Sequence, residues 1–64
     1  MKIRAIREAA GISQKLLAER ADITPAYLCG LESGKRNNPG IAIIRRIANA
    51  LNVPIDDLLD KQAS

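Results

Sequence analysis

Several residue types are missing from this 64-residue chain or occur only once. It has no histidine, phenylalanine or tryptophan, and it has a single cysteine, Cys29, and a single tyrosine, Tyr27. One cysteine excludes an internal disulfide framework, and the lack of histidine excludes zinc fingers, histidine-based catalytic triads and histidine-rich metal sites. No nucleophile with a neighbouring base and no metal cluster can be assembled, so we expect a protein that is not an enzyme and needs no cofactor.

Long apolar runs are also missing. No stretch of the chain approaches the roughly 20 apolar residues that a bilayer-spanning helix needs. Residues 1–12 are too rich in charge for a secretion signal, since they include Lys2, Arg4, Arg7 and Glu8. We therefore expect no contact with a membrane and a location in the cytoplasm.

The short length allows one domain at most. A chain of 64 residues is near the lower size at which a single core holds a fold. Without phenylalanine or tryptophan, that core must be built from isoleucine, leucine, valine and alanine. We expect one domain over residues 1–60, followed by a frayed tail over residues 61–64.

The charge is unevenly distributed along the chain. The formal net charge is +3, but residues 1–46 hold nine basic and four acidic residues, and residues 47–64 hold one basic and three acidic residues. A basic region of this kind favours binding to the phosphates of a nucleic acid, although surface lysines and arginines also serve simply to keep small proteins soluble. The charge alone does not decide between these readings.

The segment from Ser13 to Gly34 predicts two short helices joined by a tight turn. Ser13 and Thr24 are both suited to cap the first backbone N–H groups of a helix, and Pro25 suits the first position inside one. Asp22 tolerates the left-handed backbone of a sharp turn, and Gly34 is a natural stop. Because about three residues separate the two helices, they must cross steeply, and the second helix must protrude.

Three further helices are predicted around this pair. The first covers about residues 2–10, with Ile3, Ile6 and Ala10 on one face. Another covers about residues 41–51 and ends at Asn52, and the last opens at Pro54. Ile41 and Ile43 cannot both point inward with the rest of their helix, so at least one is expected at the surface. The prediction is an all-α fold, a compact five-helix bundle with a central helix-turn-helix over about residues 13–34.

Many positions in this arrangement resemble the phage repressor and Cro-like (XRE-type) family of helix-turn-helix proteins. The matching positions span about residues 3–60 and comprise Ser13-Gln14, Leu17-Ala18, Ile23-Thr24, Tyr27-Leu28, Leu31-Glu32, Gly34-Lys35, Ile47-Ala48, Ala50-Leu51, Val53, Asp56 and Leu58-Leu59. The resemblance implies a lambda repressor-like DNA-binding domain that regulates transcription, with its recognition helix over about residues 24–33 in the major groove. It also implies a homodimer on a palindromic site.

The candidate DNA-binding residues lie on the recognition helix, at the start of the helix before it, and in the loop after it. The resemblance implies that Gln14 contacts a phosphate and braces the recognition helix. Lys35 and Arg36, with the amides of Asn37 and Asn38, are expected at the phosphate backbone. The full set is Gln14, Lys15, Thr24, Pro25, Ala26, Tyr27, Gly30, Lys35, Arg36, Asn37 and Asn38.

The outward face of the predicted recognition helix has few groups that read bases. At 100° per residue it carries Ala26, Cys29, Gly30 and Ser33, where relatives commonly have longer polar side chains. Ala26 is able to touch a thymine methyl group, and Thr24 and Tyr27 are able to hydrogen-bond bases or phosphates. Our hypothesis is that discrimination comes from a few direct contacts together with DNA shape.

Other notable residues have structural interpretations. Arg7 and Glu32 match family positions that form a partly buried ion pair, which implies a structural role. Asp56 and Asp57 are adjacent on a helix, so they diverge and are expected to be N-terminal helix acids and not a catalytic pair. A redox role for Cys29 stays open beside the more ordinary reading of an inert small residue.

Two alternatives to a simple regulator remain at this stage. A DNA-binding antitoxin or a restriction-modification controller keeps the same fold and adds an unidentified protein partner, for which the sequence shows no surface. A helix-turn-helix domain turned to protein binding is the other alternative, and the donor-poor recognition face favours it.

Overall fold

Side-chain caps mark the start of two helices, and left-handed residues mark the end of three. The fold is known from a computed structural model, which describes residues 2–36 and 39–59. Over those residues it has five helices and no strands: α1 (Ile3–Ala9), α2 (Gln14–Ala21), α3 (Pro25–Ser33), α4 (Ile41–Leu51) and α5 (Ile55–Leu58). The predicted all-α, five-helix architecture is confirmed. The expected tail at residues 61–64 lies outside the described residues.

Both predicted side-chain caps are present. The hydroxyl of Ser13 accepts a hydrogen bond from the backbone N–H of Leu16 at 3.0 Å, and that of Thr24 accepts one from Tyr27 at 3.1 Å. Pro25 follows as the first residue of α3. These bonds satisfy backbone donors that have no partner inside the helix.

Three helices end in a residue with left-handed backbone. Asp22 and Asn52, both at φ 59°, follow α2 and α4, and Gly34 at φ 86° follows α3. The N–H groups of Asp22 and Asn52 bond back to carbonyls of the last turn, as such caps do. These three helices therefore end at the residues predicted from the sequence.

Two details at the ends of helices differ from the prediction. Ala10, expected on the inward face of the first helix, is exposed, because α1 ends at Ala9 and the chain turns away at Gly11 with φ 75°. Pro54 precedes α5 in an extended conformation and is not its first residue, so α5 is a single turn with Asp56 and Asp57 near its start.

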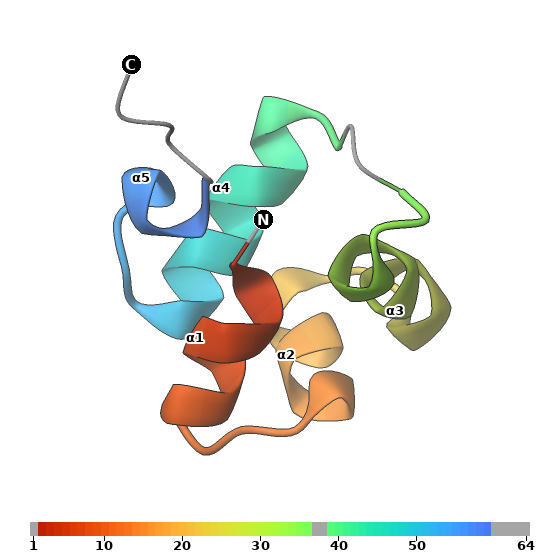
Figure 1. The fold of residues 1–64 in the computed structure, drawn as a ribbon, viewed down its shortest axis with the longest axis horizontal. Helices are drawn as coiled ribbons and strands as arrows, with labels where there is room; N and C mark the ends of the chain where they lie inside the picture. The colour runs from red at the N-terminus through yellow and green to blue at the C-terminus, as the bar shows by residue number, and fades with distance from the viewer. Residues whose placement is uncertain (1, 37–38, 60–64) are drawn as a thin grey trace.

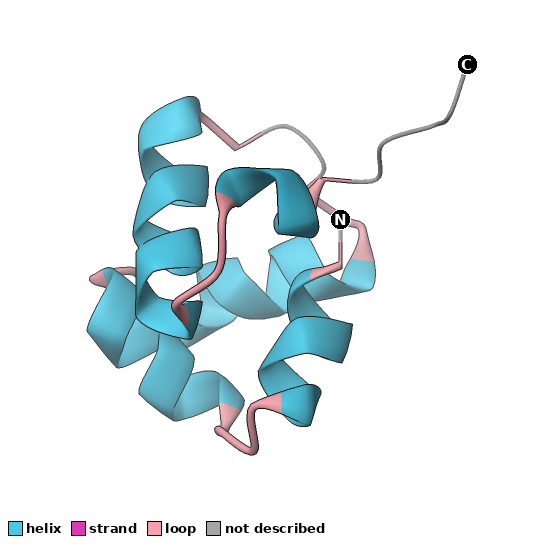
Figure 2. Ribbon diagram, turned by 90° about the vertical axis from the view of Figure 1, so that its left-hand side faces the viewer, coloured by secondary structure: helices cyan, strands magenta, loops and turns pink. Residues whose placement is uncertain are grey.

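The core is aliphatic, as predicted. The most extensive contact is between α2 and α4, with α1, α3 and α5 packed around them (Figures 1 and 2). The backbone N–H of Lys2 donates to the carbonyl of Leu58 at 2.9 Å, which ties the start of α1 to the end of α5. The buried residues are Ile3, Leu17, Ala18, Ala21, Leu28, Leu31, Ile44, Ile47, Ala48, Leu51 and Leu58.

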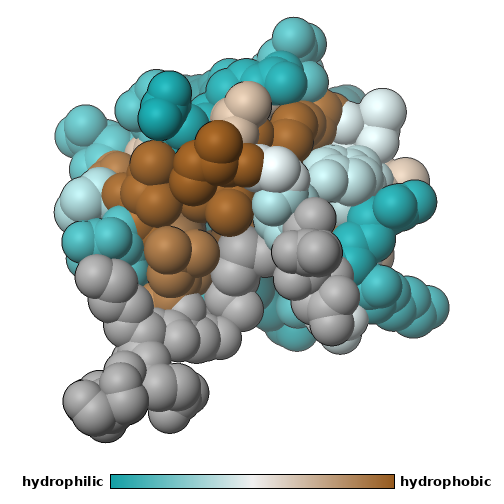
Figure 3. Space-filling view, turned by 90° about the horizontal axis from the view of Figure 1, so that it is seen from above, coloured by the Kyte–Doolittle hydropathy of each residue, from teal (hydrophilic) through white to brown (hydrophobic). Residues whose placement is uncertain are grey.

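Apolar side chains also reach the surface on one side of the molecule. The face seen from above, where α4 begins and α5 lies, carries an apolar patch (Figure 3). Ile41, the first residue of α4, is 59% exposed, whereas Ile43 is partly buried. The expectation that one of these two isoleucines is exposed is confirmed.

No helix among the described residues is both long enough and apolar enough to cross a membrane.

Candidate nucleic-acid interface

The third helix stands at one side of the molecule, next to α2 and away from α5 (Figure 1). Only Asp22, Ile23 and Thr24 separate it from α2. The left-handed backbone at Asp22 turns the chain, and the N–H of Ile23 bonds back to the carbonyl of Ala18 at 2.9 Å. This tight connection fixes α3 relative to α2 without a flexible loop.

One face of α3 is buried and the opposite face is open. Leu28 and Leu31 are 0% and 3% exposed and anchor the inner face in the core. On the outer side, Ala26, Cys29 and Ser33 are exposed and Gly30 is partly exposed. The predicted division of α3 into an inward face and an outward face is confirmed.

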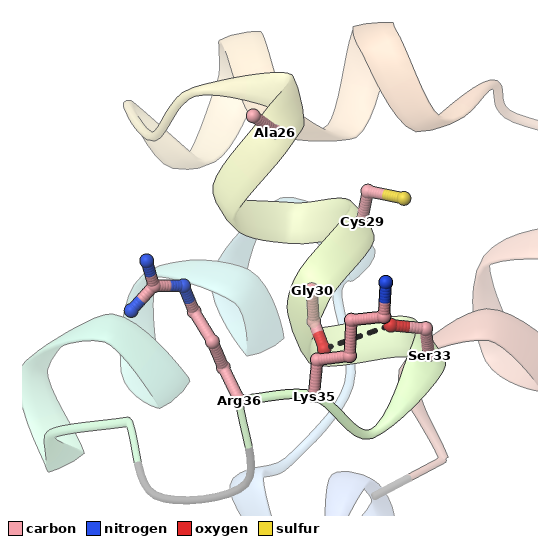
Figure 4. A pocket seen from close by; sticks show the side chains of 6 residues that line it. All are labelled: Ala26, Cys29, Gly30, Ser33, Lys35 and Arg36. Carbon is pink, nitrogen blue, oxygen red and sulfur yellow. Dashed lines mark hydrogen bonds between the residues drawn. The ribbon is translucent and has the colours of Figure 1, made fainter.

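The outer face of α3 and the segment after it line an open hollow of about 480 Å³ (Figure 4). Among the described residues, none of those that line it is acidic, and two of them are cations. The lining residues are Ala26, Cys29, Gly30, Ser33, Lys35 and Arg36. A surface of small side chains beside positive charge suits a large anionic ligand that approaches the helix backbone closely.

Arg36 lies against this helix. Its backbone N–H donates to the carbonyl of Gly30 at 3.0 Å, and its guanidinium carbon is 5.2 Å from the centre of the Tyr27 ring. That distance is within the range of a cation–π contact. The side chain of Arg36 is therefore positioned by α3, although it belongs to the segment that follows.

A polar network holds the C-terminal end of α3. Arg7 on α1 donates from Nε and Nη2 to the two carboxylate oxygens of Glu32, at 2.7 and 3.2 Å, and from Nη1 to the carbonyl of Ile12 at 2.9 Å. Gln14, the first residue of α2, donates from Nε2 to Glu32 Oε1 at 3.0 Å. Three segments of the chain thus meet at one carboxylate.

This network is largely shielded from water. The side chains of Arg7 and Glu32 are 12% and 4% exposed. The hydrogen bond to Glu32 raises the pKa of Arg7, although burial acts in the opposite direction. Arg7 therefore keeps its charge at physiological pH, and the ion pair joins α1 to the end of α3.

The structure gathers some of the predicted site residues and leaves others apart. The hollow is lined by four of them: Ala26, Gly30, Lys35 and Arg36. A fifth, Tyr27, contacts the side chain of Arg36. Thr24 and Pro25 are exposed at the start of α3. Gln14 lies near the C-terminal end of α3, where it is hydrogen-bonded to Glu32. Lys15 is exposed on the first turn of α2. Asn37 and Asn38 lie outside the described residues.

The contact of Arg36 with Tyr27 and Gly30 was not predicted from the sequence. One signal for it was present, because a glycine inside a helix is unfavourable and often marks a place where another group approaches closely. Cys29 and Ser33, which were placed on the outward face but not among the site residues, also line the hollow.

The described residues offer no evident place for a metal ion. Across residues 2–36 and 39–59, no three cysteine, aspartate or glutamate side chains come together in a way that could hold one.

Comparisons with known proteins agree with this architecture. A family model described as Helix-turn-helix (HTH_3) matches residues 3–58. The chain is 31% identical over 61 residues to the HTH-type transcriptional regulator SinR of Bacillus subtilis, covering 95% of this chain and 55% of SinR. It is 33% identical over 60 residues to the HTH-type transcriptional repressor RghR of the same organism, covering 94% of this chain and 44% of RghR.

A phage protein and a solved structure are also similar. The Immunity repressor protein of Bacillus phage phi105 is 30% identical over 61 residues, which are 95% of this chain and 42% of that protein. The chain thus spans about half the length of these curated relatives. The N-terminal DNA binding domain of SinR from Bacillus subtilis superposes with a TM-score of 0.86 at 30% identity, covering 98% of this chain and 91% of that one.

Proposed function

Because the chain belongs to the helix-turn-helix family, we propose that it binds specific sequences of double-stranded DNA and acts in the cytoplasm as a small transcriptional regulator. Helix α3 enters the major groove with its outer face toward the bases. The basic segment that begins at Lys35 lies at the phosphate backbone, and Gln14 and Lys15 contact phosphates from the start of α2. The protein performs no chemistry on the DNA.

One observation carries this proposal: the open face of α3 is built from small side chains and is flanked by Lys35 and Arg36, with no acidic residue among those described in the hollow. Small residues let the helix approach the base edges closely, and the cations release counterions from the phosphates. The names of the relatives, which describe transcriptional regulators and a DNA-binding domain, support the same function.

The geometry at the other end of α3 suits a contact to the backbone of the DNA. Gln14 stands at the start of α2, where backbone N–H groups favour an anion. Its side-chain amide has two N–H donors, of which one bonds to Glu32. The second is available in this arrangement to donate to a phosphate oxygen while the first keeps the side chain in place.

A symmetric homodimer is the second part of the proposal. The apolar patch on the side of α4 and α5 and the exposed Ile41 support it, because a second copy of the chain would remove this surface from water (Figure 3). A dimer of this kind places two recognition helices on half-sites about one helical turn apart, so the preferred DNA site is a palindrome.

Two experiments test the proposal. In a titration against random-sequence duplex DNA, we expect dissociation constants of about 10⁻⁴ to 10⁻⁶ M near physiological salt and a steep loss of affinity as salt rises. In vitro selection is then expected to yield a palindromic site bound at least about 10³-fold more tightly. No salt-dependent binding to any duplex would contradict the proposal.

A protein-binding module is the second candidate. The small, donor-poor side chains on the outer face of α3 favour it, since direct base reading usually uses long polar side chains. An antitoxin or a controller protein would combine both activities. Binding to a partner protein with no binding to DNA would identify the second candidate.

A further inference from the structure

The outer face of α3 lacks a long hydrogen-bond donor, but a donor from the next segment lies alongside it. Arg36 is six residues beyond Gly30, and its backbone N–H is bonded to the Gly30 carbonyl at 3.0 Å. In Figure 4 its side chain runs along α3 on the side away from Cys29, whereas Lys35 and Ser33 lie on the other side of Gly30. The two neighbouring cations therefore take different positions relative to the helix.

Gly30 provides the space that Arg36 occupies. A Cβ atom at position 30 would lie 3.3 Å from both Cγ and Cδ of Arg36, which is closer than ordinary van der Waals contact. A glycine inside a helix makes it less stable than an alanine would. Accommodation of the arginine side chain is a physical reason for a glycine at this position.

Tyr27 holds the other end of the side chain. The guanidinium carbon is 5.2 Å from the centre of the Tyr27 ring, and Tyr27 is only two residues after Pro25, where α3 begins. The charged group therefore lies beside the middle of α3, between Gly30 and the ring of Tyr27. In helix-turn-helix proteins the N-terminal residues of the recognition helix are the ones that meet base edges.

From this geometry we infer that Arg36 reads a base: its guanidinium donates two hydrogen bonds to O6 and N7 of a guanine in the major groove, with Gly30 and Tyr27 as its positioning residues. The planar, forked guanidinium matches those two acceptors, and stacking on an aromatic ring limits its freedom before binding. Lys35, on the other side, contacts phosphate only. This inference rests on the proposed function. Within the basic segment that begins at Lys35, it moves Arg36 from the phosphate backbone to a base edge and so assigns base specificity to a residue outside α3.

The experiment compares variants on the DNA site obtained by selection and on duplexes that carry each single-base change. For Arg36→Ala we expect discrimination at one guanine of each half-site to fall by about 10- to 100-fold, with discrimination at other positions kept. The matched control is Lys35→Ala, which is expected to weaken binding to all duplexes alike and to reduce the salt slope by about one unit.

A second variant acts through position 30 and leaves every charge in place. Gly30→Ala requires the Arg36 side chain to shift by a few tenths of an ångström. We expect it to lower discrimination at the same guanine, by less than Arg36→Ala does, with an unchanged salt slope and a helix that is no less stable. Circular dichroism of each variant establishes that it is folded.

The outcomes separate the two proposals. If Arg36→Ala weakens binding to all duplexes by the same factor, Arg36 is a phosphate contact and the inference is overturned, while DNA binding stands. If the unaltered protein binds no duplex, both proposals are overturned.

Discussion

Arg7 and Glu32, 25 positions apart in the chain, form a two-point ion pair that fastens the first helix to the end of the third. The Nε–Oε2 and Nη2–Oε1 distances are 2.7 and 3.2 Å, and the carboxylate is 4% exposed. Gln14 adds a third hydrogen bond to the same carboxylate. Because α3 is otherwise anchored mainly by Leu28 and Leu31, this pair helps to set the direction in which α3 faces outward.

Removal of Arg7 alone is expected to destabilise the protein strongly. Arg7→Ala leaves the nearly buried carboxylate of Glu32 without its charge partner, and we expect a loss of about 2–4 kcal/mol in the free energy of unfolding. Urea denaturation followed by circular dichroism measures this loss.

The matched control replaces both partners. In the double variant Arg7→Met with Glu32→Leu, apolar side chains of similar size fill the site, so much of the lost stability is expected to return. Equal stability of the single variant and the unaltered protein would contradict this account of the ion pair.

Leu28 is expected to be the most sensitive position of the inner face of α3. Its side chain is fully buried, and Leu28→Ala should lower the free energy of unfolding by about 2–5 kcal/mol. A domain of this size has a total stability on the order of 3–10 kcal/mol, so this variant is expected to lose about half of it and to melt at a much lower temperature. Thermal denaturation tests the prediction.

Ile47→Val provides a graded comparison in the same core. Ile47 is also fully buried, and loss of one methylene group should lower the stability by only about 0.5–1.5 kcal/mol. A loss from Leu28→Ala no greater than that from Ile47→Val would show that this site relaxes around the cavity.

Ser13 is expected to stabilise α2 through its cap alone. Ser13→Ala removes the 3.0 Å hydrogen bond to the N–H of Leu16, which should lower stability by about 1 kcal/mol. Ser13→Asp keeps an acceptor at the same place and should retain most of the stability. Chemical denaturation of the three proteins distinguishes a capping role from a simple change of polarity.

Asp22 occupies a left-handed conformation that most residues avoid. Its φ is 59°, which costs alanine more than glycine. Asp22→Ala is therefore expected to lower the free energy of unfolding by about 1 kcal/mol, while Asp22→Gly should stay within about 0.5 kcal/mol of the unaltered protein. Both variants lose the exposed carboxylate that lies 3.6 Å from Arg46, so the difference between them isolates the backbone effect. Equal losses in thermal denaturation would assign the effect to the carboxylate instead.

Ile41 is expected to influence association and not folding. It is 59% exposed in the single chain, so Ile41→Ser should change the free energy of unfolding of the monomer by no more than about 0.5 kcal/mol. If this surface joins two copies, the same change weakens the dimer, as measured by sedimentation equilibrium. An unchanged association constant would place the dimer contact elsewhere.

The order of the helices and most of their boundaries could be predicted from the sequence, because the responsible interactions are local. A cap such as Ser13 or Thr24 acts on a backbone group three residues away, and left-handed stops at Asp22, Gly34 and Asn52 depend on the residue itself. The exposed Ala10 shows the limit of this reasoning, since periodicity continues one residue past the real end of α1.

The sequence by itself determined an aliphatic, all-helical domain with a protruding third helix, because helix propensity, capping and the spacing of apolar residues act over a few positions. Only the tertiary structure decided that Arg36 lies over Gly30 and Tyr27, and that Gln14 and Arg7 meet at Glu32. These contacts depend on where separate segments come to lie in space once the core has packed. A side chain as long as arginine reaches many places from one backbone position, and the fold selects among them.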